Sequence, residues 1–204
     1  MIRNVIFDYG NVLIDWSPWY LFFDHFGGDE TKCRHFLEHI CNREWFTRVD
    51  QGESMDSCIE DLQRQYPEWA DDISLFRDRW FDMCHGPVPG MQELIDELKM
   101  GGIGVFGLSN WPAETFPVAR KRFRILSCID NYVVSSFVGM VKPDPAIYRF
   151  LLDKYSLDAA DCVFIDDRID NVNAAISVGM QGIQFDGSAQ NLRNALISLD
   201  LIKI

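Results

Sequence analysis

Three short apolar runs in this chain stop abruptly at polar residues of the kinds that bind phosphate or metal ions. The runs and the residues that follow them are 5–7 with Asp8, 103–108 with Ser109 and Asn110, and 163–165 with Asp166 and Asp167. Short, bounded apolar runs are typical of strands buried on both faces of a parallel sheet. Ligands bind just beyond the carboxyl ends of such strands, so these distant segments are expected to meet at one site.

The carboxylates in this set indicate the kind of ion that the site would hold. Asp8, Asp166 and Asp167 have no His or Cys beside them in the sequence. Oxygen ligands alone suit a hard cation such as Mg2+ better than a transition metal. We therefore expect Mg2+ as the cofactor.

The overall charge restricts the partners. The chain has 204 residues, 48% of them hydrophobic, and a net charge of −12. This length fits one domain, or one core with an insertion, and the charge argues against nucleic acid or an anionic membrane as the main partner. A phosphorylated ligand would be repelled at long range, so a local cation and a nearby Lys must overcome that field.

Cysteine usage and the N-terminus favour a cytoplasmic protein. The six cysteines include no CxxC pair, and a chain of this size does not need disulfides, so we expect free thiols in a reducing compartment. The first apolar run ends after three residues, which is too short for a signal peptide. No stretch approaches the roughly 20 apolar residues of a membrane span.

The order of strand-like and helix-like segments along the sequence divides the chain into a core and an insertion. Residues 1–15 and 86–204 alternate between strand-like and helix-like segments, which predicts an α/β, Rossmann-like core of three layers with a mainly parallel sheet. Expected strands are 3–7, 103–108, 132–134, 163–165 and 182–185, and expected helices are 90–100, 113–122, 144–155, 170–178 and 188–199. Residues 16–85 lack strand alternation and predict a small helical bundle placed over the sheet as a cap.

One patch of the insertion stands out as a candidate for substrate contact. It comprises residues 42–46 and 50–53, in which Arg43 and Trp45 could bind a substrate's polar edge and apolar face. The alternative is that this patch is only a helix end and turn, with Gly52 in the turn and Ser54 capping the next helix.

Four motifs occur in order along the chain. They are Phe7–Leu13 (Phe-Asp-Tyr-Gly-Asn-Val-Leu), Leu108–Asn110, Val141–Pro145 (Val-Lys-Pro-Asp-Pro) and Phe164–Asp167. Together they resemble the haloacid dehalogenase (HAD) superfamily of hydrolases, in the subfamily with a helical type 1 cap after the first motif. The Asp-x-Gly-Asn-Val pattern is similar to a branch that includes sugar-phosphate phosphatases, among them glucose-1-phosphate phosphatases.

The resemblance implies roles for these residues. Asp8 would attack phosphorus and form an aspartyl-phosphate, with Mg2+ held by Asp8, the carbonyl of Gly10 and Asp167. Asp166 would hold a metal-bound water or a neighbouring position. The residues implied for phosphoryl binding are Ser109, Asn110 and Lys142, of which Ser109 and Lys142 would also be catalytic.

Position 10 departs from the family pattern. Many phosphatases of this superfamily carry an acid two residues after the nucleophile, where it protonates the leaving oxygen and later activates water, but this chain has Gly10. General acid–base catalysis is worth about 10²–10⁴ in rate. The missing acid has three explanations: the substrate has a good leaving group, another group from the cap or substrate replaces the acid, or the protein is weak or inactive.

Three functions follow from these observations. The first is Mg2+-dependent hydrolysis of a small phosphorylated metabolite, a phosphomonoester that could be a sugar phosphate. The second is a silent phosphate-binding or interaction module. The third, a 2-haloacid dehalogenase, needs no metal and would not be expected to keep the acidic pair Asp166-Asp167. The sequence assigns no oligomeric state.

Overall fold

A five-stranded parallel sheet forms the centre of the protein in the computed structural model, which describes residues 2–203. Its order is β5-β4-β1-β6-β7, and the strands are β1 Asn4–Phe7, β4 Gly104–Ser109, β5 Asn131–Val134, β6 Cys162–Asp166 and β7 Gln181–Gln184. Phe7 of β1 pairs with Gly107 and with Ile165, so the three central strands end at the same edge. The predicted α/β class with a mainly parallel sheet is confirmed.

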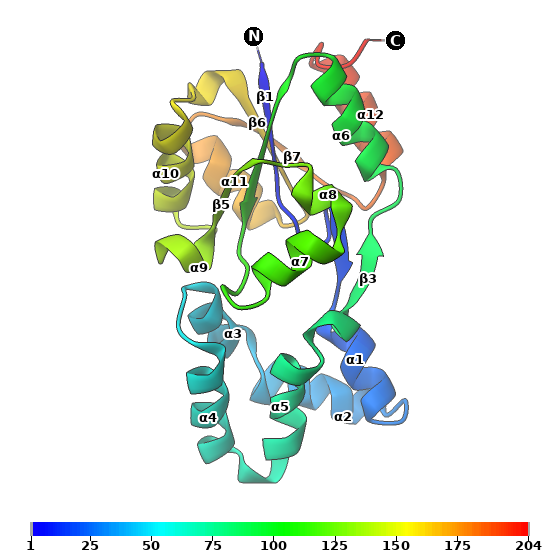
Figure 1. Ribbon diagram of the computed structural model, residues 1–204, viewed down its shortest axis with the longest axis vertical. Coiled ribbons are helices and arrows are strands. Elements are labelled where there is room, and N and C mark those ends of the chain that lie inside the picture. The colour runs from blue at the N-terminus through cyan, green and yellow to red at the C-terminus, as the bar shows by residue number, and fades with distance from the viewer. Residues whose placement is uncertain (1, 204) are drawn as a thin grey trace.

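Helices cover both faces of this sheet and bury two separate apolar clusters. Successive residues of β1 point to opposite faces, so Val5 and Phe7 join one cluster while Ile6 joins the other. The helices α6 and α12 lie on one side of the sheet, and α10 and α11 lie on the other (Figure 1). The helices of this part are α6 Met91–Met100, α7 Phe116–Arg122, α8 Arg124–Ser127, α9 Ser135–Val138, α10 Pro145–Tyr155, α11 Ile169–Ser177 and α12 Ala189–Ser198.

A helical insertion lies beyond the carboxyl ends of the central strands (Figure 1). Its α-helices are α1 Pro18–His25, α2 Glu30–His35, α3 Arg43–Asp50, α4 Met55–Gln65 and α5 Ala70–Asp78. A π-helical turn, Phe36–Ile40, extends α2, and short 3-10 turns flank α5. We call residues 17–83 the helical insertion.

Two short antiparallel strands join the insertion to the sheet. Strand β2 (Ile14–Trp16) precedes the insertion and pairs with β3 (Cys84–Pro87), which follows it. The expected boundaries at 15/16 and 85/86 fall within this two-stranded ribbon. The sequence pattern missed the ribbon because its strands are three and four residues long and one of them contains Gly and Pro.

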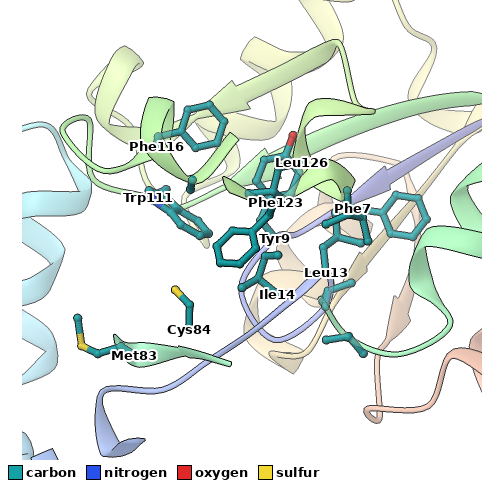
Figure 2. Close-up of a cluster of buried hydrophobic side chains, with 14 of the residues drawn as sticks. Phe7, Tyr9, Leu13, Ile14, Met83, Cys84, Trp111, Phe116, Phe123 and Leu126 are labelled. Atoms are coloured by element: carbon teal, nitrogen blue, oxygen red, sulfur yellow. The ribbon is translucent and has the colours of Figure 1, made fainter. Parts of the chain in front are cut away.

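The backbone beside Asp8 is anchored by the packing of Tyr9. The Tyr9 ring is fully buried and stacks on Phe116 with centroids 6.0 Å apart (Figure 2). Its ring occupies the space over Gly107, where any Cβ would overlap the phenol. This packing fixes the chain where it leaves β1, and therefore fixes the position of Asp8.

Most predicted elements occur with small shifts at their ends, but α3 was not predicted. Asn42 accepts a hydrogen bond from the Trp45 N–H at 3.0 Å and so caps a helix that runs from Arg43 to Asp50.

Within residues 2–203, no helix is both long enough and apolar enough to cross a membrane.

Candidate active site

Three carboxylates converge at the carboxyl edge of the sheet. Asp8 follows β1, Asp166 ends β6, and Asp167 comes next in the chain. One carboxylate oxygen from each lies within 4.8 Å of the others. This all-oxygen donor set fits a hard divalent cation such as Mg2+.

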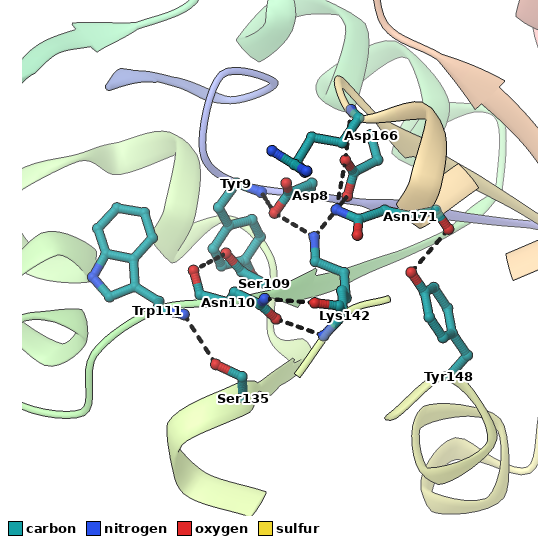
Figure 3. Close-up of polar contacts among 11 residues, drawn as sticks. Asp8, Tyr9, Ser109, Asn110, Trp111, Ser135, Lys142, Tyr148, Asp166 and Asn171 are labelled. Carbon is teal, nitrogen blue, oxygen red and sulfur yellow. Dashed lines mark hydrogen bonds and ion pairs between the residues drawn. The ribbon is translucent and has the colours of Figure 1, made fainter. Parts of the chain in front are cut away.

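Lys142 lies between two of these carboxylates (Figure 3). Its Nζ is 2.8 Å from Asp8 Oδ1 and 2.7 Å from Asp166 Oδ2, and only 1% of its side chain is exposed. Asp8 Oδ1 also accepts a hydrogen bond from the Tyr9 N–H at 2.6 Å. Asp8 Oδ2 has no hydrogen bond to any described residue, so it is available to a ligand.

Asp166 is fully occupied as a hydrogen-bond acceptor. Its Oδ1 accepts from the Arg168 N–H and Oδ2 from Lys142, while the Asn171 amide donates to both oxygens at 2.9 and 3.0 Å. These contacts make Asp166 the anchor of Lys142. Asp167 instead lines the cavity described below, so Asp8 and Asp167 are the carboxylates best placed to hold a cation.

Burial and neighbouring charges shift the pKa values of the ionisable groups in the site in opposite directions. Burial raises the pKa of Asp8 above its ordinary value even though Lys142 opposes the shift. Burial would also raise the pKa of Asp166, but Lys142 and the hydrogen bonds to it hold that pKa below its usual range. Burial alone would lower the pKa of Lys142, yet Asp166 and Asp8 raise it. Lys142 is therefore a fixed positive charge, and Asp8 is the carboxylate that a bound cation would help to ionise.

Asn110 holds the loop that carries Lys142. Its side-chain amide donates to the Lys142 carbonyl at 3.1 Å and accepts from the Lys142 N–H at 2.9 Å (Figure 3). Asn110 and Lys142 both line the cavity. Ser109 lies behind them: it is 1% exposed, its hydroxyl contacts the Asn110 carbonyl at 3.4 Å, and it does not line the cavity.

A cavity of about 350 Å³ extends from these residues into the helical insertion. Its polar end is lined by Asp8, Gly10, Asn11, Asn110, Lys142, Asp167, Arg168 and Asn171. Its apolar wall is contributed by Trp16, Pro18, Leu37, Cys41, Phe46, Phe76, Trp80, Trp111 and Pro112. Asn42, Arg43, Thr47 and Asp50 add polar groups from the insertion.

The two residues of the insertion that were predicted to contact substrate, Arg43 and Trp45, lie on different faces of α3. Arg43 lines the cavity, but Trp45 does not. Trp45 is 5% exposed, and its indole N–H donates to the Cys58 carbonyl at 2.8 Å, which joins α3 to α4. Residues three or four apart share a helix face, so the face that carries Arg43 continues through residues 46–47 to Asp50. The expectation for Trp45 is therefore corrected, because its side chain packs inside the insertion.

The insertion contacts the core beside this cavity. Ser135 accepts a hydrogen bond from the Trp111 N–H at 3.1 Å and donates to the Asp50 carbonyl at 2.6 Å. Gly52 has φ +97°, and a Cβ there would lie 2.5 Å from the Ser136 carbonyl oxygen. Farther along, Glu114 accepts from the backbone N–H that begins α4 at 2.9 Å.

Two residues of the site were missed by the sequence reasoning. Asn171 is buried in the first turn of α11, where polar residues are common, so nothing in its sequence context marks it. Asp50 belongs to the patch of residues 42–46 and 50–53 that the sequence singled out. Only the helical periodicity of α3 places it in the cavity together with Arg43.

The comparisons with known proteins agree with this geometry. A family model described as haloacid dehalogenase-like hydrolase matches residues 2–179. The chain is 31% identical over 188 residues to the sesquiterpene phosphatase astK of Aspergillus oryzae, covering 91% of each.

Solved structures share the fold. A predicted HAD-like family hydrolase from Porphyromonas gingivalis superposes with a TM-score of 0.74 at 22% identity, over 98% of both chains. A HAD family enzyme from Bacteroides thetaiotaomicron, in complex with magnesium and inorganic phosphate, gives 0.68 at 19% identity, over 92% of this chain and 96% of that one. The chain therefore belongs to the haloacid dehalogenase-like hydrolases.

Proposed function

We propose that this protein is a Mg2+-dependent phosphatase that hydrolyses a phosphomonoester through an aspartyl-phosphate on Asp8. The observation that carries the proposal is the position of Asp8, with one oxygen fixed by Lys142 and Tyr9 and the other free at the end of a shared cavity. A carboxylate with one oxygen held and one available can act as a nucleophile.

Asp8, the Gly10 carbonyl and Asp167 would hold the cation. Mg2+ would supply charge neutralisation between the carboxylate and the phosphate, two anions that otherwise repel. The cluster of carboxylate oxygens within 4.8 Å supports this fit.

The chain's own residues would position and stabilise the phosphoryl group. Lys142 presents a permanent positive charge to it, and Asn110 holds that lysine's backbone in place. Ser109 is buried and does not line the cavity, so its contact with the phosphoryl group stays a prediction from the sequence motif. Attack by Asp8 forms the bond to phosphorus and releases the ester oxygen, and water then breaks the aspartyl-phosphate to release phosphate.

The substrate's body would be largely apolar. Aromatic and aliphatic side chains, including Phe46, Trp80 and Trp111, form the wall opposite the polar end of the cavity. Phe46 and Trp80 stack with centroids 5.7 Å apart, and both line the cavity. The relative named as a sesquiterpene phosphatase supports the same class, whereas the resemblance to sugar-phosphate phosphatases favours a polar body.

A panel of esters tests this proposal. Phosphate release should depend on Mg2+, stop with EDTA and be abolished in Asp8→Asn, because the amide is not a nucleophile. Esters with an apolar body should give a higher kcat/KM than glucose 1-phosphate, and Trp80→Ala should reduce that preference. Equal rates with Mg2+ and EDTA would remove the metal role, and an active Asp8→Asn variant would reassign the nucleophile.

Gly10 favours a second candidate, a phosphate-binding module without turnover. Such a module would bind phosphate in the presence of Mg2+ and hydrolyse no ester of the panel. The two candidates differ in whether another group replaces the acid that position 10 lacks.

A further inference from the structure

We propose that Asp50, the last residue of α3, performs the proton transfers that an acid at position 10 would perform. The inference rests on the proposed phosphatase function and adds a catalytic residue to it. In the first step the Asp50 carboxyl gives its proton to the leaving oxygen as the phosphorus–oxygen ester bond breaks. In the second step its carboxylate takes a proton from water as the water oxygen attacks phosphorus and the bond to Asp8 breaks.

Asp50 lies in the insertion, opposite the sheet-side residues of the cavity. It lines the same cavity as Asp8, Lys142 and Asp167, but it comes from the helical insertion. Its backbone carbonyl is held by the Ser135 hydroxyl at 2.6 Å, so the residue is fixed against the core. Because Asp8 would attack phosphorus from the sheet side, the proton donor for the leaving oxygen has to lie elsewhere in the cavity. Asp50 meets this requirement because it comes from the insertion.

The Asp50 side chain is unpaired among the described residues. Its Oδ1 is buried and has no hydrogen-bond partner among the described residues, and it forms no ion pair with any of them. Buried polar atoms are nearly always paired, so one that is left free in a cavity calls for an explanation. A carboxylate at the C-terminal end of a helix is also disfavoured by the helix dipole. This placement costs stability, because no hydrogen bond or ion pair among the described residues offsets the burial of the carboxyl group.

The environment of Asp50 favours a carboxyl that can both give and take a proton. Burial raises its pKa to about 7, although the charges of Lys142 and Arg43 oppose the shift. The other charged groups that line the cavity are Asp8, Asp167 and Arg168. A general acid works best when its pKa lies near the working pH.

The other groups that line the cavity are unsuited to this proton transfer or have another role. The other titratable side chains of the lining are Asp8, Cys41, Arg43, Lys142, Asp167 and Arg168. Asp8 and Asp167 are assigned to attack and to the cation. Burial raises the pKa of the Cys41 thiol, and carboxylates raise that of Lys142, so both hold their protons too tightly, as do guanidinium groups. Asp50 is the acid that remains among the described lining residues.

An acid placed at position 10 should restore the proton transfers that are lost when Asp50 is replaced. A Cβ built on Gly10 meets no atom within 4 Å, so a side chain can begin there without displacing a neighbour. The acid at position 10 and Asp50 would then be alternatives for one task.

The experiment compares two aromatic esters that differ in their need for a proton. The alkoxide of 2-phenylethyl phosphate leaves only when protonated, whereas nitrophenolate leaves unaided from 4-nitrophenyl phosphate. In single-turnover experiments, Asp50→Asn should slow release of 2-phenylethanol by about 10²–10⁴, the usual worth of a general acid, and release of nitrophenolate by only a few-fold. Breakdown of the aspartyl-phosphate, which is the same step for both esters, should slow equally for both. Asp71→Asn, which changes an exposed acid of α5 outside the cavity, is the control for charge and should match wild type on both.

Adding Gly10→Asp to Asp50→Asn should restore much of the activity on the alkyl ester. Equal losses in the single-turnover release of the two leaving groups from Asp50→Asn would indicate a structural role and overturn the inference, as would no loss on either or no gain from the rescue. Wild-type protein that hydrolyses neither ester with Mg2+ would instead refute the proposed function, and this inference would fall with it.

Discussion

Replacing Lys142 by methionine should destabilise the protein strongly, because it would leave two buried carboxylates without their cation. The Nζ lies 2.8 and 2.7 Å from Asp8 and Asp166. At an effective dielectric constant of about 20, each contact is worth about 6 kcal/mol of Coulomb attraction, and the cost of burying the ions offsets much of it. Removing one partner of such a buried cluster typically costs about 3–5 kcal/mol, which is the loss expected in the free energy of unfolding.

Urea denaturation followed by tryptophan fluorescence, at pH 7 and with EDTA, measures this loss. Lys121→Met makes the same charge change at an exposed position of α7 and should shift the unfolding free energy by less than about 0.5 kcal/mol. Without Lys142 the folded-state pKa of Asp166 rises above its unfolded value, and the pKa of Asp8, which burial already raises, rises further. The deficit should therefore shrink as the pH falls from 7 toward about 4, where both carboxyls can be protonated. A Lys142→Met variant within 1 kcal/mol of wild type, or a deficit independent of pH, would refute this reasoning.

Three further outcomes are expected. Asp167→Asn should weaken Mg2+ binding more than about tenfold in calorimetry, since it removes a charged ligand; unchanged affinity would exclude Asp167 from the metal site. Gly52→Ala should lower the unfolding free energy by more than Gly27→Ala, because both have positive φ but only the Gly52 Cβ would meet the Ser136 carbonyl; equal losses would argue against that close contact. The kcat for an alkyl ester should fall as the pH rises past about 7, where the Asp50 carboxyl loses its proton, and this fall should be absent in Asp50→Asn.

The central sheet was predictable because its strands are buried on both faces. Runs such as 5–7 and 163–165 are apolar throughout, and parallel pairing brings their ends to one edge. The meeting of Asp8 with Asp167 follows from that topology and requires no knowledge of side-chain packing.

The cap side of the cavity was not predictable in the same way. The direction of each side chain on α3 depends on where the helix starts, and the pattern did not show that Asn42 caps it. Without that register, Trp45 looked as accessible as Arg43, and Asp50 had no assigned role. Short pairings such as the ribbon of β2 and β3 are likewise set by tertiary contacts rather than by local sequence preference.

The ribbon has a consequence for selectivity. β2 leads into the insertion and β3 leads out of it, so an opening at this tether would break the Ser135–Asp50 hydrogen bond and carry Asp50 away from the sheet, while Asp8 and Lys142 stay behind. An ester too bulky for the closed cavity could still present its phosphate to Asp8, but Asp50 would then be too far away to give its proton to the leaving oxygen. Discrimination between large and small esters would then arise in the rate of bond cleavage, with binding strength contributing little.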